Sequence, residues 1–493
     1  MRVFGYTATV MLDEGVCYRA LRGSDRRFDG LFFVGVSTTG IYCRPICPAK
    51  KPARKRCTFF VTAGAAERAG YRPCLRCRPE LAPGLAPYET RFAAASGIVA
   101  RIQQGALNGA ADIASLASQF DLSVRQLRRV VREVAGASPI QLAQTARLLL
   151  AKQLLTETAL PVTRVAFASG FSSVRRFNEA FAAHYRMPPS RLRRQSPSVS
   201  SDGTLTLRLS YRPPFAWDAL LAFLRRRAIA GVEAVDGGHY RRTVSLGGHE
   251  GWVDVAPCRA GDLLTVRVGS TLAPVLQTLL ARLRDLFDLH ARPDVIDAHL
   301  AESPTLTDLV GQRPGLRTPG AFDGFELAWR AILGQQVSVR GASTLAGRFA
   351  QRFGEPIATP FAELTRLTPE PAVVARTRAT LIAKIGLPMA RASSLRALGG
   401  TCAAQPGLLT PGTPVQRATE QLLAISGVGV WTASYIAMRA LHFPDAFPET
   451  DLGIRHALGF TRAVDITRAS QPWRPWRAYA AMHLWTRLSE DQT

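Results

Sequence analysis

The sequence is poor in acidic residues and cysteines, and it has no long apolar run. It contains 37 Asp and Glu against 62 Lys and Arg, with 8 Cys in 493 residues. The absence of an apolar stretch of 18 residues excludes a typical membrane span. The first ten residues also lack the basic segment followed by an apolar segment that is typical of a signal peptide. We therefore expect a cytoplasmic protein without membrane contact, in which disulfides are rare.

The excess of basic residues is large and unevenly distributed. The formal net charge is +25, and residues 1–196 carry +18 of it. A strongly basic segment favours a polyanionic partner, most often nucleic acid. A genome-wide preference for arginine is the alternative, because only five of the basic residues are lysines. Such a preference would not concentrate the charge in one segment.

Stretches rich in Pro, Gly and Ser divide the chain at 82–87, at 195–203 and, less sharply, at 314–324. The hydrophobic periodicity between them predicts a multidomain α+β protein. The expected domains are a small four-cysteine domain at 1–82, an all-α domain at 88–195, a small α+β domain at 204–316 and a second all-α domain at 320–493.

Four cysteines have the spacing of metal ligands. They are Cys43, Cys47, Cys74 and Cys77, two close pairs separated by 26 residues. Thiolates at this spacing in a cytosolic protein predict one tetrahedral zinc site. On spacing alone, a zinc ribbon with a purely structural role is the leading interpretation.

The sequence around these cysteines, Thr38-Thr-Gly-Ile-Tyr-Cys43-Arg-Pro-Ile-Cys47-Pro and Gly70-Tyr-Arg-Pro-Cys74-Leu-Arg-Cys77, resembles the N-terminal domain of the Ada family. The resemblance implies that Cys43 is both a zinc ligand and the acceptor of a methyl group from a DNA phosphotriester. Zinc would keep the sulfur as a nucleophilic thiolate. Methylation would then remove one negative charge beside basic residues that face DNA, so DNA affinity should rise. Those residues include Arg44, Lys50 and Lys51.

Residues 88–195 contain a repeat that is typical of helix-turn-helix units. Ser123-Val-Arg-Gln-Leu-Arg-Arg and Ser173-Val-Arg-Arg-Phe-Asn-Glu lie 50 residues apart, each after a short helix and a turn. The repeat resembles the AraC-type DNA-binding domain, which implies two helices in adjacent major grooves and RNA polymerase as a partner.

The helical phase of each repeat predicts which side chains face the core and which face DNA. In the first unit we expect Leu127 and Val130 to point inward. A solvated surface is the alternative role for any single arginine on the opposite face. The side chains expected to contact DNA are Arg125, Gln126, Arg128, Arg129, Arg175 and Arg176.

In the C-terminal half, Gly427 and Gly429 form a Gly-x-Gly turn between two helical runs, and Asp451 follows 22 residues later. Glycines at a helix N-terminus let backbone N–H groups approach a phosphate. Together with Ala331-Ile-Leu-Gly-Gln-Gln336 and Trp473-Arg-Pro-Trp, this pattern resembles the helix-hairpin-helix DNA glycosylases of the AlkA type. The resemblance covers about 204–490 and implies excision of alkylated purines.

The resemblance also assigns roles in the glycosylase half. Asp451 is expected to stabilise positive charge that develops on the sugar, although a helix cap is the ordinary role of such a residue. Gln336 is expected to fill the space left by the flipped base. The aromatic residues expected to stack on that base, with core packing as the alternative, are Trp431, Tyr435 and Trp485.

Several absent motifs narrow this function further. Trp431 occupies the position of the lysine in lyase-type relatives, so we expect a monofunctional DNA-3-methyladenine glycosylase. The chain has no late Cys-x6-Cys-x2-Cys pattern, so we expect no iron–sulfur cluster. It has no Pro-Cys-His-Arg motif either, so the guanine-O6 methyltransferase of longer Ada proteins should be missing.

The sequence thus predicts a monomeric DNA-alkylation response protein that accepts a methyl group, regulates a promoter and excises alkylated bases from double-stranded DNA. Two alternatives are a transcription regulator with an inactive glycosylase half, and a repair enzyme that is only tethered to DNA by its N-terminal half.

Overall fold

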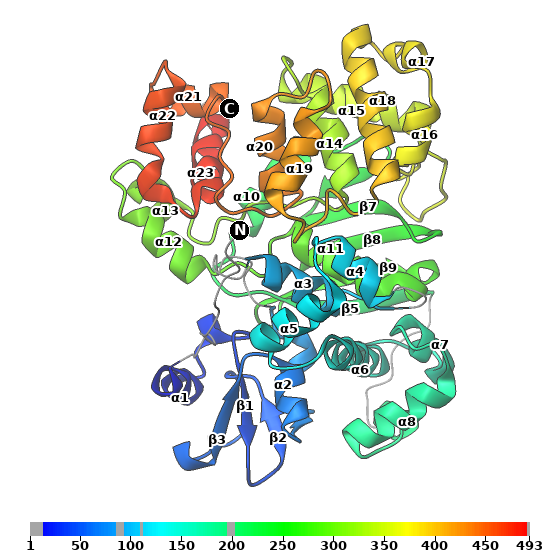
Figure 1. Ribbon diagram of the computed structural model, residues 1–493, viewed down its shortest axis with the longest axis vertical. Helices are drawn as coiled ribbons and strands as arrows, with labels where there is room; N and C mark the ends of the chain where they lie inside the picture. The colour runs from blue at the N-terminus through cyan, green and yellow to red at the C-terminus, as the bar shows by residue number, and fades with distance from the viewer. Residues whose placement is uncertain (1–12, 85–92, 109–111, 195–202, 491–493) are drawn as a thin grey trace. The chain divides into compact units, whose positions relative to one another are not determined.

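The computed structural model describes residues 13–84, 93–108, 112–194 and 203–490. The chain forms two compact units, one from residues 1–85 with 89–200 and one from 86–88 with 201–493. Figure 1 labels most of the elements of both. Within the described ranges, no helix has the length and apolar character needed to cross a bilayer.

The first part of unit 1 is a small mixed sheet with the strand order β3-β1-β2-β4. Strands β1 and β2 are antiparallel, with Val34 opposite Cys43, whereas β2 and β4 run parallel. Helices pack against apolar side chains of this sheet region such as Phe32 and Tyr42, both fully buried. The elements are α1 (Glu14–Gly23), β1 (Phe33–Val36), β2 (Ile41–Cys43), β3 (Cys57–Phe60), α2 (Ala63–Arg68) and β4 (Arg72–Pro73).

The second part of unit 1 is all-helical, as the repeat predicts. Ser123 and Ser173 each cap the N-terminus of the second helix of a repeat. The helices are α3 (Ala93–Gln103), α4 (Ile113–Ser118), α5 (Val124–Ala135), α6 (Pro139–Glu157), α7 (Val162–Ala168), α8 (Val174–Tyr185) and α9 (Pro189–Arg194).

Two details of helix α5 differ from the sequence prediction. Val131, not Val130, is fully buried, because it stands four residues after the buried Leu127 on the same face. The side-chain oxygen of Gln126 accepts hydrogen bonds from the backbone and hydroxyl of Ser123 at 2.9 Å, which leaves only its amide nitrogen for a contact with DNA. This capping box explains why glutamine stands at the third position of the helix.

The two parts of unit 1 are joined by buried polar contacts to the long helix α6. Lys152 Nζ of α6 lies 2.7 Å from Glu80 Oε2 and donates to the carbonyl oxygen of Cys74 at 3.1 Å. Glu67 of α2 accepts from the hydroxyl of Tyr42 at 2.8 Å and lies 3.2 Å from His184 of α8. The four-cysteine region and both helical repeats therefore form one packed body.

Unit 2 begins with an antiparallel sheet in the order β5-β9-β8-β7-β6. Its strands alternate buried and exposed side chains, as in β5, because one face packs against helices. The elements are β5 (Thr204–Ser210), α10 (Trp217–Arg225), β6 (Glu233–Asp236), β7 (His239–Leu246), β8 (His249–Pro257), β9 (Leu263–Gly269), α11 (Leu276–Leu286), α12 (Pro293–Ala301) and α13 (Thr307–Gln312).

The rest of unit 2 is helical. Helix α14 packs against α18 and α20, and α21 packs against α23 (Figure 1). These helices and the loops between them carry all the residues predicted for base excision. They are α14 (Gly324–Leu333), α15 (Val339–Phe353), α16 (Pro371–Arg376), α17 (Ala379–Ala383), α18 (Met389–Ala404), α19 (Val415–Leu423), α20 (Val430–Arg439), α21 (Leu452–Leu458), α22 (Ala463–Ala469) and α23 (Arg477–Glu490).

Candidate metal centre and candidate active site

The structure brings the four predicted cysteines together. The sulfur atoms of Cys43, Cys47, Cys74 and Cys77 all lie within 4.8 Å of one another. A tetrahedral Zn²⁺ with Zn–S bonds of about 2.3 Å needs sulfur atoms about 3.8 Å apart. The cluster fits such an ion with small side-chain adjustments, and its donor set of four thiols is the one that zinc prefers.

Cys43 differs from the other three cysteines in its surroundings. Its side chain is partly exposed, whereas Cys47, Cys74 and Cys77 are buried. Backbone N–H groups of Arg44 and Arg76 donate to the sulfurs of Cys77 and Cys74 at 3.3 and 3.4 Å. Among the described hydrogen bonds, no backbone N–H group donates to the Cys43 sulfur. Hydrogen bonds draw electron density from a thiolate, so the thiolates of Cys74 and Cys77 would be weaker nucleophiles than that of Cys43.

The prediction that Arg44 contacts DNA is wrong. Its side chain is buried and forms an ion pair with Asp29, with Nε 2.8 Å from Asp29 Oδ1, and it also donates to the carbonyl of Cys77. Arg44 therefore holds the metal loops in place. Lys50 is exposed, and Lys51 is partly buried and donates to the carbonyl oxygen of Cys47 at 2.6 Å.

The arginines of the two repeats lie on the exposed faces of α5 and α8. Arg129 and Arg175 have carboxylate neighbours one turn later, Glu133 at 3.9 Å and Glu179 at 2.9 Å. Exposed pairs of this kind are weak, so phosphate groups could replace the carboxylates. The exposed arginines are Arg125, Arg128, Arg129, Arg175 and Arg176.

In unit 2, Asp451 accepts hydrogen bonds from two of the three predicted aromatic residues. Asp451 Oδ2 accepts from the indole N–H of Trp431 at 2.9 Å, and Oδ1 accepts from the indole N–H of Trp485 at 2.9 Å. The carboxylate also caps α21 by accepting from the backbone N–H of Ile454. The helix-cap role and the predicted functional position therefore coincide, and three donors fix the orientation of the carboxylate.

The aromatic side chains form one continuous set. The rings of Trp431 and Tyr435 are stacked, with centroids 5.4 Å apart and planes 9° from parallel. The ring centroid of Trp485 lies 6.1 Å from that of Tyr435. All three residues and Asp451 are partly exposed, so the set opens to the surface and is not enclosed in the core.

Gln336 and the Gly-x-Gly turn lie in exposed loops. Gln336 has a φ of +56°, a strained conformation for a residue with a side chain. Gly427 has a φ of +86°, and a Cβ there would lie 2.5 Å from the Ser394 hydroxyl, so glycine is required. Gly429 caps the N-terminus of α20.

Two residues near this site were not predicted from the sequence. Gln335 donates to the carbonyl of Gly427 at 2.9 Å and to the Thr432 hydroxyl at 3.1 Å, which joins the Gln336 loop to the turn. Arg439 donates to the hydroxyl of Tyr435 at 2.7 Å. The spacing of four residues on one helix was the only sequence signal for the second pair.

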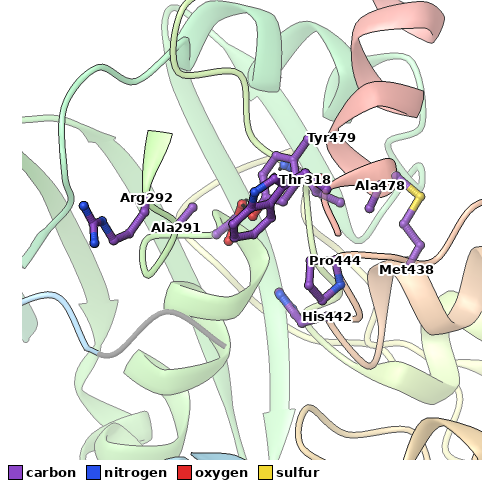
Figure 2. A pocket seen from close by; sticks show the side chains of 10 residues that line it. Ala291, Arg292, Thr318, Met438, His442, Pro444, Ala478 and Tyr479 are labelled. Carbon is purple, nitrogen blue, oxygen red and sulfur yellow. Dashed lines mark hydrogen bonds between the residues drawn. The ribbon is translucent and has the colours of Figure 1, made fainter. Parts of the chain in front are cut away.

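A small, partly open cavity of about 20 Å³ lies elsewhere in unit 2 (Figure 2). Its walls include His442, Thr318 and Asp288, whose carboxylate accepts from the Tyr479 hydroxyl at 2.8 Å. Burial raises the pKa of Asp288 to about 6. None of the predicted site residues lines this cavity, which has room for about one water molecule.

Comparisons with known proteins agree with this architecture. Residues 16–80 match the metal-binding domain of Ada, 116–195 match a helix-turn-helix domain and 206–323 match the AlkA N-terminal domain. A Mycobacterium tuberculosis protein named as a bifunctional transcriptional activator and DNA repair enzyme is 41% identical over 484 residues, 96% of each chain.

Two further relatives cover the C-terminal half. DNA-3-methyladenine glycosylase 2 of Escherichia coli is 36% identical over 279 residues, which are 56% of this chain and 95% of that protein. The solved 3-methyladenine DNA-glycosylase of Archaeoglobus fulgidus shares the fold, with a TM-score of 0.51 and 19% identity over 57% of this chain and 98% of its own.

The chain belongs to the family of bifunctional transcriptional activators and DNA repair enzymes, with an Ada-type metal-binding domain and a helix-turn-helix domain joined to a DNA glycosylase half. It is therefore a DNA-binding protein of alkylation repair and its regulation, as the sequence predicted.

Proposed function

We propose that Cys43 accepts a methyl group from a methylated DNA phosphotriester. The observation that carries this proposal is that Cys43 is partly exposed whereas the other three cysteines are buried. Backbone N–H groups also donate to the sulfurs of Cys77 and Cys74, and among the described hydrogen bonds none donates to that of Cys43. A bound zinc ion would keep the sulfurs as thiolates at neutral pH. The Cys43 sulfur then attacks the methyl carbon, the methyl–oxygen bond breaks, and its electrons remain on the phosphate as a diester.

The same transfer changes the electrostatics of the DNA-facing side. A thiolate becomes a neutral thioether, so one negative charge disappears from the small domain that also carries the exposed Lys50, Lys55 and Arg56. Binding to DNA phosphates should strengthen, and the gain should shrink at high salt. The Cys74 carbonyl accepts from Lys152 of α6, and the Tyr42 hydroxyl donates to Glu67, which lies beside His184 of α8. The altered site is therefore also linked to α8, which carries Arg175 and Arg176. We infer a methylation-dependent activator that recruits RNA polymerase at a promoter.

In the C-terminal half, we propose hydrolysis of the N-glycosidic bond of alkylated purines such as 3-methyladenine. Asp451 is positioned by Trp431 and Trp485 to stabilise the positive charge that develops on the sugar. Trp431 and Tyr435 present aromatic surface to a flipped, cationic base. Because a tryptophan stands where a lyase has its lysine, the product is an intact abasic site.

The contacts to DNA divide between the two halves. Gln336 is proposed to enter the space of the flipped base, and the N–H groups near Gly427 and Gly429 to bind the phosphate backbone. Specific promoter contacts are assigned to α5 and α8, through Arg125, Arg128, Arg129, Arg175 and Arg176.

Two measurements test these proposals on the full chain. Peptide mass mapping after incubation with methylated DNA should show a gain of about 14 Da, one methyl in place of one proton, on the Cys43 peptide. The label should persist in Cys57→Ala, which removes a buried cysteine outside the cluster, and disappear in Cys43→Ser. A label on Cys47, Cys74 or Cys77 would refute the assignment.

For the second proposal, chromatography of bases released from the same DNA should show 3-methyladenine, and borohydride should trap no covalent adduct. Absence of any released base would leave a regulator with an inactive glycosylase half. A trapped adduct would contradict monofunctional hydrolysis.

A further inference from the structure

The hydroxyl group of Tyr435 is held from one side by a buried arginine. Arg439 Nη1 donates to Tyr435 Oη at 2.7 Å, while Nε and Nη2 donate to the carbonyls of Pro319 at 2.8 Å and Gly320 at 3.0 Å. Arg439 is only 4% exposed. Because a guanidinium group has only donors, the tyrosine oxygen must accept from it, and the phenolic proton has to point elsewhere.

That proton has no acceptor among the described residues of the chain, where the bond from Arg439 is the one hydrogen bond of the Tyr435 hydroxyl. The ring itself is partly exposed and stacks on Trp431, whose indole holds Asp451. The free O–H group therefore belongs to the same aromatic set that the proposed function assigns to the flipped base.

The surrounding charges make this hydroxyl a stronger donor than an ordinary phenol. Burial acts to raise the pKa of Tyr435, but Arg439 and Arg227 outweigh it and the pKa is lowered. Arg227 stacks on Phe223 at 3.7 Å, and Arg439 lies 5.0 Å from the same ring.

We propose that Tyr435 donates its phenolic proton to the departing base, that Arg439 is the positioning residue that frees this proton, and that the pair favours excision of uncharged purine lesions. The inference rests on the proposed glycosylase function. It adds a leaving-group role to a tyrosine so far assigned only to stacking.

The chemistry distinguishes two classes of base. When the bond between C1′ and N9 breaks, its electron pair goes to the base. A cationic alkylated purine leaves as a neutral molecule and needs no proton. A neutral purine would leave as an anion, so it takes the Tyr435 proton on a ring nitrogen or carbonyl oxygen. Water adds hydroxide to C1′, and its remaining proton restores the phenol through solvent.

The test compares two duplex substrates under single-turnover conditions with the full chain. One carries hypoxanthine, which is neutral, and the other carries 7-methylguanine, which is cationic. In Tyr435→Phe, which keeps the ring but removes the proton, the ratio of the hypoxanthine rate to the 7-methylguanine rate should fall roughly 100-fold, the usual worth of a positioned proton donor. Arg439→Met should lower the same ratio, and Arg439→Lys, which still donates, should restore part of it.

The possible failures are separable. Equal losses on both substrates in Tyr435→Phe would overturn the inference and leave Tyr435 as a stacking residue. A wild type that excises 7-methylguanine but no hypoxanthine would also overturn it, with the glycosylase function intact. Release of neither base would refute the proposed function itself, and this inference with it. Tryptophan fluorescence, which reports folding of unit 2, guards against misfolded variants.

Discussion

The ammonium group of Lys152 donates to the carbonyl oxygen of Cys74 at 3.1 Å. Lys152 lies on α6 and Cys74 is a proposed metal ligand, so one hydrogen bond links the long helix of the helix-turn-helix part to the backbone of the four-cysteine cluster. Both side chains of the accompanying ion pair, Lys152 and Glu80, are buried. A movement of the Cys74 backbone would therefore act directly on Lys152 and so on α6.

Replacement of Lys152 tests this link. Lys152→Met leaves Glu80 as a buried carboxylate with one cation fewer, which should cost about 3–5 kcal/mol of stability. The Cys74 loop also loses an anchor, so zinc should be released faster to a chelator. Circular dichroism during denaturation and chelator kinetics measure the two effects.

The exposed Lys384 gives a matched control. Lys384→Met should change stability by no more than about 0.5 kcal/mol, because it removes a solvated charge. The proposed link would be contradicted if Lys152→Met released zinc at the same rate as Lys384→Met and had the same free energy of unfolding.

Substitution of Asp451 separates its two roles. Asparagine is as good a helix cap as aspartate, so Asp451→Asn should keep the fold and DNA binding. Loss of the negative charge should slow release of alkylated purines by about 10²–10³ in single-turnover assays. Glu449→Gln is the control two residues earlier, because it keeps an oxygen to accept from Thr467. Excision by Asp451→Asn at the rate of Glu449→Gln would remove Asp451 from the mechanism.

Sequence patterns were sufficient where the chemistry depends on residues close together in the chain. The spacing of Cys43, Cys47, Cys74 and Cys77 predicted a cluster that the structure contains. The Ser caps of the repeats predicted the starts of α5 and α8. In each case local geometry fixes the outcome, so distant residues are not needed.

Sequence patterns failed where the role of a side chain depends on a partner far away in the chain. Arg44 looked like a DNA contact beside other basic residues, but Asp29 on another segment pairs with it and buries it. The contact between Arg439 and the Tyr435 hydroxyl also escaped prediction, because an arginine on a mostly apolar helix gives no hint of the carbonyls of Pro319 and Gly320, about 120 residues earlier. Burial and pairing of charges are properties of the assembled fold.

A buried histidine should make the glycosylase half sensitive to acid. His483 is 1% exposed, and burial lowers its pKa from 6.5 to about 4. Below pH 6.5 the unfolded chain takes up a proton that the folded chain refuses, so stability falls until about pH 4. At pH 5 this group alone costs about 2 kcal/mol, at 1.36 kcal/mol per pH unit.

His483→Leu should remove that part of the pH dependence. The difference in stability between pH 7 and pH 5 should shrink by about 2 kcal/mol relative to wild type. All seven tryptophans lie in residues 204–493, so fluorescence during denaturation follows this half of the full chain. An unchanged difference between the two pH values would show that His483 is not the responsible group.

The role proposed for Gln336 can be isolated from catalysis by the choice of substrate. A side chain that fills the space of a flipped base assists only where there is a stack to leave, which is in duplex DNA. Gln336→Ala should therefore slow excision from a duplex by about tenfold, or about 1.4 kcal/mol, and leave excision from the same single strand at its wild-type rate. Exposed Thr344, on the following helix, offers the control Thr344→Ala, which loses only a hydrogen bond within its own helix. Gln336→Leu should keep most of the duplex rate, since an apolar side chain fills the same space. If Gln336→Ala slows both substrates equally, the residue supports the active site and does not occupy the vacated stack.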